Sequence, residues 1–133
     1  MYIYRRGDSL QIIISNSVDT PIYEQIEASI KESILKGELV GGEMLPSIRT
    51  LAKDLRISNI TTKRAYEELE HDGFITSIPG KGYFVKTKSE EFLKEEIYTK
   101  IEEKLNEAIN LAQTYNIDEQ EIKEMLDTLL KEE

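Results

Sequence analysis

The chain has 133 residues and a formal net charge of −9, which fits one small domain with an appended helical segment and argues against a uniformly basic protein. It contains no cysteine, which excludes a disulfide framework or a thiolate zinc site and fits a reducing cytoplasm. No apolar run approaches the roughly 18 residues of a membrane span, and the N-terminus lacks the pattern of a secretory signal.

The charge is divided unevenly along the chain. Residues 1–43 hold four Lys and Arg against seven Asp and Glu, residues 44–88 hold eight against five, and residues 89–133 hold five against fourteen. Because salt screens charges over about 8–10 Å, local charge governs contact with phosphate more than the total does. The cationic middle segment is therefore the candidate nucleic-acid surface, and the acidic tail is expected to face away from it.

Residues 1–19 are predicted to form an N-terminal arm with one short strand. Met1 to Ser9 is expected to be a flexible terminus, with a short strand or an adhesive arm at Tyr2-Ile3-Tyr4 as the alternatives, and Arg5-Arg6 is a candidate phosphate contact. Leu10 to Ile14 is typical of a strand. The sequence leaves open whether this strand packs against the helical domain or pairs with a partner chain.

Residues 20–88 are predicted to form the principal domain. Its first helix starts at Thr20-Pro21, a capping residue followed by proline at the first helical position, and ends at Gly37. The apolar stripe of this helix repeats in steps of four at Ile22, Ile26, Ile30 and Ile34. We expect it to be the scaffold helix on which the next elements pack.

The following segment has the pattern of a helix-turn-helix. Ser47 is the predicted N-cap of a short helix, whose buried stripe is Ile48, Leu51, Ala52 and Leu55. Residues 56–59 form the predicted turn, with Ser58 or Asn59 capping a second helix that ends at Asp72-Gly73. Two helices joined in this way can place the second helix in the DNA major groove.

The outward face of the second helix holds the candidate DNA contacts. Polar β-branched residues such as Thr61 and Thr62 at a helix start, beside cations, suit phosphate oxygens and thymine methyls better than they suit helix stability. The candidate residues are Ser58, Asn59, Ile60, Thr61, Lys63 and Arg64. A solvated helix start would explain the Ser, Thr and Asn residues alone, so the neighbouring elements decide between the two interpretations.

A β-hairpin is predicted to follow this helix. Phe74 to Ile78 and Tyr83 to Val85 are typical of strands, and Pro79-Gly80-Lys81-Gly82 is a turn with a cation at its tip. Alone, such a glycine-rich turn is a common loop. After a helix-turn-helix it indicates a wing, in which Gly80 and Lys81 lie close to DNA.

Residues 89–133 are predicted to form a helical dimerisation segment of two helices. The first runs to about Tyr115, and the second starts near Ile117-Asp118 with a pattern similar to a capping box. The predicted interface residues are Tyr98, Ile101, Leu105, Ala108, Ala112, Tyr115, Met125 and Leu129. Because two helices cannot bury this much apolar surface alone, we expect a homodimer, with packing against the principal domain as the alternative.

No catalytic arrangement is visible in the sequence. The single histidine, His71, lies near a predicted helix end, where it suits capping of carbonyls better than general-base chemistry. The paired glutamates of the tail are typical of solvated helix faces and not of metal ligands. The chain is therefore not expected to be an enzyme or to bind a metal or cofactor, and the sequence does not indicate a small-molecule effector.

The successive segments LPSIRTLA, DLRISNITTKRAYEELEHDGFI and PGKGYFV together resemble the winged-helix domain of the GntR family of bacterial transcription regulators, over about Pro21 to Lys86. The short C-terminal extension and the Ala65-Tyr66 pair are similar to the YtrA-like subfamily. The resemblance implies that Arg49 contacts DNA from the start of the first helix of the helix-turn-helix. It also implies DNA contacts by the start of the second helix and by Gly80 and Lys81 at the wing tip. The Asn59-Ile60 pair departs from the family's pattern, so the base preference cannot be transferred.

The sequence thus predicts a mainly α fold with a small β-hairpin wing: a winged helix-turn-helix followed by a C-terminal two-helix dimerisation segment. The expected function is that of a sequence-specific DNA-binding transcription regulator, a repressor that acts as a homodimer on an inverted-repeat operator of double-stranded DNA. The alternative is a winged-helix protein-interaction module without specific DNA readout. That alternative predicts an apolar or acidic outer face on the second helix of the helix-turn-helix.

Overall fold

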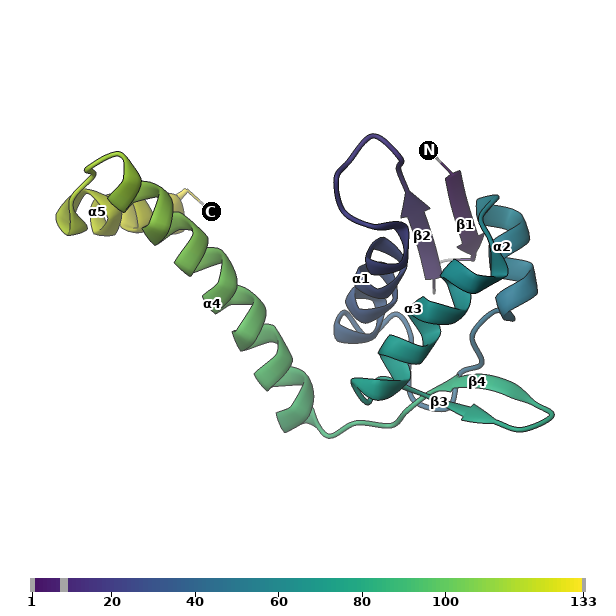
Figure 1. Ribbon diagram of the computed structural model, residues 1–133. Helices are drawn as coiled ribbons and strands as arrows, with labels where there is room; N and C mark the ends of the chain where they lie inside the picture. The colour runs from purple at the N-terminus through teal and green to yellow at the C-terminus, as the bar shows by residue number, and fades with distance from the viewer. Residues whose placement is uncertain (1, 8–9, 133) are drawn as a thin grey trace. The chain divides into compact units, whose positions relative to one another are not determined.

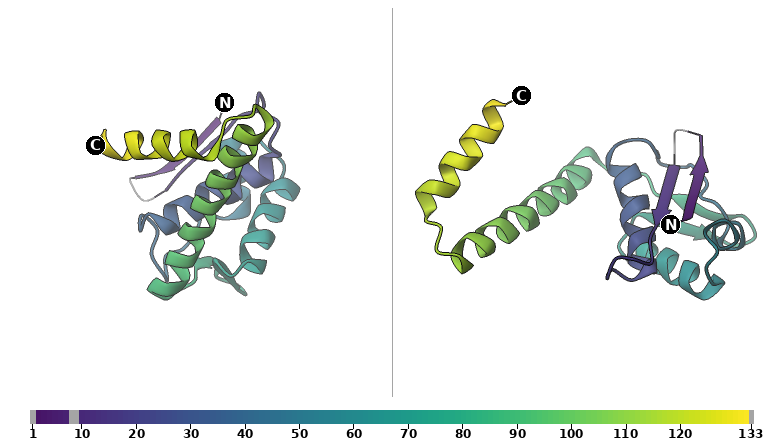
Figure 2. Two further views of the ribbon diagram at one scale, coloured as in Figure 1. Left: turned by 90° about the vertical axis from the view of Figure 1, so that its left-hand side faces the viewer. Right: turned by 90° about the horizontal axis from the view of Figure 1, so that it is seen from above.

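The computed structural model describes residues 2–7 and 10–132. Within these residues it contains five helices and four strands (Figure 1), which confirms the predicted mainly α fold with a small β component. The chain divides into two compact units, Met1–Glu90 and Glu91–Glu133. In the first unit, three helices and two β-hairpins form one body (Figure 2).

Helix α1 (Ile22–Leu35) is the scaffold of the first unit. Its residues Ile26, Ile30 and Ile34 are buried, as the apolar stripe predicted. Pro21 and not Thr20 occupies the N-cap position, and no side chain of the described residues caps the helix, so the predicted cap is wrong. Proline has no N–H of its own to satisfy, and the Gln25 Nε2 donates to the Thr20 carbonyl at 2.9 Å, which fixes the segment before the helix.

The N-terminal residues form a β-hairpin. Strands β1 (Tyr2–Arg6) and β2 (Leu10–Ile14) pair antiparallel, with Tyr4 opposite Ile12. Strand β2 contacts α1 and strand β1 contacts the next helix, α2. Alternate residues bury one face of the hairpin: Tyr4, Leu10, Ile12 and Ile14. The flexible terminus expected from the sequence is therefore wrong for β1, and β2 packs against the helical domain.

Helices α2 (Ile48–Leu55) and α3 (Asn59–His71) form the predicted helix-turn-helix. The Ser47 Oγ accepts from the Thr50 N–H at 3.1 Å, and the Ser58 Oγ accepts from the Thr61 N–H at 3.0 Å. Both helices therefore begin at a serine cap. The buried residues between α1, α2 and α3 are Leu51, Ala52, Leu55, Ala65, Tyr66 and Leu69.

Strands β3 (Ile75–Ile78) and β4 (Gly82–Val85) pair antiparallel and form the predicted wing. The segment before α2 lies along the other edge of β4, where the Gly42 N–H donates to the Val85 carbonyl at 2.8 Å and the Leu45 N–H donates to the Tyr83 carbonyl at 2.9 Å. These hydrogen bonds connect the start of the helix-turn-helix to the wing.

Helices α4 (Glu90–Thr114) and α5 (Glu119–Lys131) form a helical hairpin. Asn116 has a φ of 58° between them, and the Asp118 Oδ1 caps α5 by accepting from the Glu121 N–H at 2.9 Å. In the described part of this hairpin only Ala112 is buried. Over residues 2–7 and 10–132, no helix has the length and apolar character that crossing a membrane requires.

Candidate nucleic-acid interface

A concavity of about 400 Å³ lies between α2 and the start of α3. We call it the α2–α3 concavity; its lining residues are Arg49, Thr50, Ala52, Lys53, Ile57 and Asn59. Arg49 and Lys53 are exposed and stand four residues apart on α2, so their side chains project from the same side of the helix. The concavity therefore presents two cations and one amide, groups that bind phosphate oxygens.

The first turn of α3 holds the predicted reading residues. Asn59 and Ile60 are exposed, and Ile60 is the more unusual because it is apolar. The Ser58 Oγ donates to the Thr61 Oγ1 at 2.9 Å, so both hydroxyls take part in the cap of the helix. The Thr61 hydroxyl is thereby left with its own proton to donate.

Thr62 lies on the inner side of α3. It is fully buried, and its Oγ1 donates to the Ser58 carbonyl at 3.2 Å. The outward role inferred for the Thr61-Thr62 pair is therefore wrong for Thr62. Thr62 stands three residues before the buried Ala65, and residues three apart share a face of a helix. This spacing was the sequence signal that places Thr62 on the inner face.

The two cations of α3 differ in their surroundings. The Lys63 Nζ lies 3.7 Å from the Glu67 Oε1, and both side chains are more than half exposed, so this pair is weak. The Arg64 guanidinium stacks on the ring of Tyr23 in α1, with its Cζ 3.9 Å from the ring centroid, and its Nη2 donates to the Tyr23 hydroxyl at 3.1 Å. Arg64 is therefore oriented toward α1.

The wing tip carries Lys81 between two glycines. Gly80 has a φ of 76° and Gly82 a φ of 118°, values that residues with a side chain rarely adopt. Lys81 is exposed. Glu70 of α3 holds the wing, since its Oε2 accepts from the Ser77 N–H at 2.8 Å and from the Ser77 Oγ at 3.0 Å.

Tyr66 connects α3 to the start of α2 and to the wing. Its buried hydroxyl donates to the Pro46 carbonyl at 2.7 Å, and its ring forms a T-shaped pair with the Tyr83 ring at a centroid distance of 5.0 Å. Burial raises the pKa of the Tyr66 hydroxyl above its ordinary value of 10.0. The hydroxyl therefore remains a donor at neutral pH, and the geometry of the helix-turn-helix does not depend on its ionisation there.

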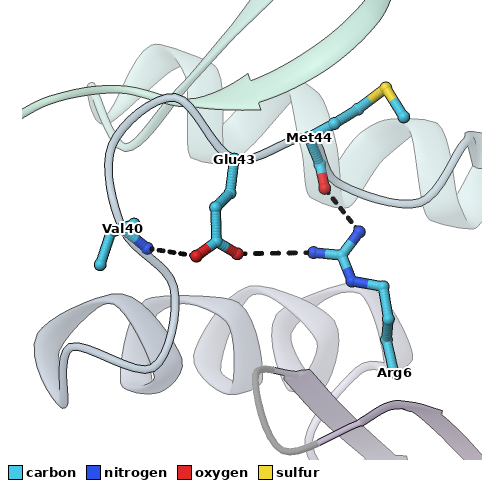
Figure 3. A network of polar contacts seen from close by, with 4 residues as sticks. All are labelled: Arg6, Val40, Glu43 and Met44. Atoms are coloured by element: carbon cyan, nitrogen blue, oxygen red, sulfur yellow. Dashed lines mark hydrogen bonds and ion pairs between the residues drawn. The ribbon is translucent and has the colours of Figure 1, made fainter.

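The N-terminal hairpin contacts the segment that precedes α2 and the C-cap of α2, which the sequence did not indicate. The Arg6 Nη1 donates to the Met44 carbonyl at 2.6 Å, and its Nη2 lies 3.8 Å from the Glu43 Oε2 (Figure 3). At the other end, the Arg56 Cζ lies 5.3 Å from the centroid of the Tyr2 ring. Arg56 has a φ of 56°, a conformation costly for a residue with a Cβ. The hairpin thus contacts the helix that carries the α2–α3 concavity at its C-cap, and it also contacts the segment that leads into that helix.

In the second unit, most of the predicted interface residues are exposed. These are Tyr98, Ile101, Leu105, Ala108, Tyr115, Met125 and Leu129, whereas Ala112 is buried within the hairpin itself. A groove of about 640 Å³ between α4 and α5 is lined mainly by apolar side chains, including Leu105, Ile109, Met125 and Leu129. Within residues 2–7 and 10–132, no group of three or more His, Asp or Glu is placed to hold a metal ion.

Residues 22–85 match the family model described as bacterial regulatory proteins, gntR family. Over 90 residues the chain is 40% identical to the HTH-type transcriptional repressor YtrA of Bacillus subtilis (strain 168), a match that covers 68% of this chain and 69% of that protein. Some relatives are much longer, and the chain covers as little as 14% of the length of one of them.

Solved structures share the architecture. A transcriptional regulator from Oenococcus oeni aligns with a TM-score of 0.73 and 27% identity, over 88% of this chain and 97% of that chain. YtrA from Sulfolobus acidocaldarius, a GntR-family transcription factor, aligns with a TM-score of 0.55 and 41% identity, over 68% of this chain and 96% of that chain.

Proposed function

Because the chain belongs to the GntR family of bacterial regulatory proteins, we propose that it is a sequence-specific DNA-binding repressor, which acts in the cytoplasm as a homodimer on an inverted-repeat operator. Its relatives described above are transcription regulators and not enzymes. The observation that carries the proposal is the α2–α3 concavity, where Arg49 and Lys53 meet Asn59 at the start of a capped helix.

This arrangement suits binding of a DNA backbone phosphate next to the major groove. A phosphate in the concavity would contact Arg49 and Lys53, and the positive end of the α3 dipole would favour the same anion. Asn59 and Ile60 would then meet base edges in the major groove, with the Thr61 hydroxyl and Lys63 directed to base or phosphate oxygens. The predicted base or phosphate contact of Arg64 would require it to leave the ring of Tyr23.

The wing supplies a contact outside the major groove. Lys81 is exposed at a tip whose glycines allow close approach of the backbone, and Glu70 holds the wing on α3. We therefore place Gly80 and Lys81 against the flanking phosphates or the minor groove.

The homodimer rests on the apolar residues of the second unit. Ile101 is 50% exposed, Leu105 45% and Leu129 58%. Fully burying an exposed leucine or isoleucine side chain contributes about 1.5–3 kcal/mol, and covering these half-exposed side chains would contribute roughly half of that each, so several such residues per copy can offset the cost of association. A twofold dimer would present two α3 helices to half-sites about 34–36 Å apart, which is why the operator is proposed to be an inverted repeat.

One observation favours a second candidate, a protein-binding winged helix. Ile60 is 81% exposed and could enter an apolar pocket of a protein partner. The cations Arg49, Lys53 and Lys63 around the start of α3 favour DNA, since an apolar protein pocket would leave them without counter-charges.

The salt dependence of duplex binding tests the proposal. Each phosphate contact contributes about −0.9 to the slope of log K against log salt, so Lys63→Ala is expected to weaken binding to all duplexes and to reduce the slope by about one unit. Lys100→Ala, which removes an exposed cation from α4, serves as the matched control and should leave the slope unchanged. A wild-type affinity that does not vary with salt would overturn the proposal, and an unchanged slope for Lys63→Ala would remove that contact.

A further inference from the structure

Among the described residues, Ile60 is the most exposed of the large hydrophobic side chains, with 81% of its surface open to solvent. It lies in the first turn of α3, between Asn59 and Thr61. Successive residues of an α-helix are rotated by about 100°. Ile60 therefore points almost directly away from the buried face of α3, which consists of Thr62, Ala65, Tyr66 and Leu69.

This position separates Ile60 from the stability of the fold. The core of the first unit is closed by residues on the opposite side of α3, and alanine has a higher helix propensity than isoleucine. An exposed isoleucine at this point neither fills the core nor favours the helix. Its apolar surface is available to a ligand that approaches the outer face of α3.

The neighbours of Ile60 define the chemistry of that ligand. Asn59 offers an amide to hydrogen-bonding edges, Lys63 offers a cation to phosphate, and the α2–α3 concavity adds Arg49 and Lys53. A partner for this surface combines anionic groups and hydrogen-bonding edges with a small apolar group. The major groove of DNA has this combination, and the apolar group that its base edges present is the 5-methyl group of thymine.

We propose that Ile60 is a specificity-determining residue that reads the 5-methyl group of one thymine in each half-site of the operator. This inference rests on the proposed DNA-binding function and deepens it. The removal of one methyl group from water is worth about fourfold in affinity. A dimer that buries one methyl in each of two half-sites would therefore gain about fifteenfold.

The test replaces thymine with deoxyuridine, which pairs with adenine in the same way and lacks only the 5-methyl group. A duplex selected by the wild-type protein is substituted one thymine at a time, and the affinity of each duplex is measured at one salt concentration. We expect one thymine in each half-site at which deoxyuridine weakens wild-type binding about fourfold. Ile60→Ala should bind the thymine and deoxyuridine duplexes equally, which is the non-additivity of two groups in contact.

Ile13→Ala is the matched control, because it removes an exposed isoleucine from β2, whose outer face is not part of the proposed DNA contact. This variant should retain the full deoxyuridine penalty. If no thymine shows the penalty, or if Ile60→Ala remains as sensitive as the wild type, the inference is wrong while specific DNA binding stands. If the wild type selects no sequence at all, the proposed function fails and the inference fails with it.

Discussion

Removal of the Tyr66 hydroxyl is expected to loosen the helix-turn-helix at one defined point. Tyr66→Phe leaves the buried Pro46 carbonyl without the donor that now lies 2.7 Å away, while the ring that meets Tyr83 is retained. A buried acceptor left without its donor costs about 1–3 kcal/mol. For a unit of this size, each kcal/mol corresponds to a fall of about 4–8 °C in Tm.

The free energy of unfolding can be measured by urea titration, followed by circular dichroism because the chain has no tryptophan. All variants must be compared at one protein concentration, since the proposed dimerisation would make the apparent stability depend on concentration. Tyr83→Phe is the control: it removes a hydroxyl from the same ring pair at a partly exposed position, where water replaces lost hydrogen bonds. We expect it to cost less than about 0.5 kcal/mol. Equal losses for the two variants would refute the role of the Tyr66–Pro46 hydrogen bond.

Tyr66→Phe is also expected to change how the free energy of unfolding depends on pH in the alkaline range. Burial raises the pKa of Tyr66 in the folded state above its ordinary value of 10.0, so the folded state holds this proton more tightly than the unfolded state. The resulting stability is fully present below about pH 10 and is lost as the pH rises above that value. Tyr66→Phe should therefore lose stability less steeply than the wild type above pH 10. Parallel slopes would show that Tyr66 does not contribute to the alkaline transition.

Two further substitutions test the remaining contacts. Leu105→Asp places a charge on the apolar face of α4 and is expected to give monomers in sedimentation, whereas Lys104→Ala on the same helix should remain dimeric; a dimeric Leu105→Asp would move the interface elsewhere. Arg6→Ala removes the hydrogen bond to the Met44 carbonyl and should lower the free energy of unfolding by about 1 kcal/mol, while Arg5→Ala, on the exposed side of β1, should not; equal effects in urea titration would contradict the contact.

Local signals in the sequence predicted most of the helix-turn-helix and the wing. A serine followed by a helical apolar stripe was sufficient to locate the cap at Ser47 and to narrow the second cap to Ser58 or Asn59, because a cap depends on residues within one turn; the structure has Ser58 there. Glycines beside Lys81 likewise predicted the tip of the wing, since the positive φ values there favour residues without a side chain.

Contacts between distant residues were not predictable in this way. The N-terminal hairpin is stabilised by Arg6 at the Met44 carbonyl, 38 residues further along the chain, and by the stacking of Arg56 on Tyr2. Arg64 reaches Tyr23 over 41 residues. Such pairs depend on the tertiary arrangement of helices and strands, whereas the pattern of each segment reports only its own buried face.

The most direct test of DNA reading is selection from a random duplex pool by the wild type and by Arg49→Ala in parallel, at one near-physiological salt concentration. We predict that the wild type enriches an inverted repeat with half-site centres about one helical turn apart. Arg49→Ala, which lacks one cation of the α2–α3 concavity, should enrich no sequence under the same conditions. Failure of the wild type to enrich any sequence, or enrichment of the same repeat by Arg49→Ala as strongly as by the wild type, would contradict specific DNA reading through this concavity.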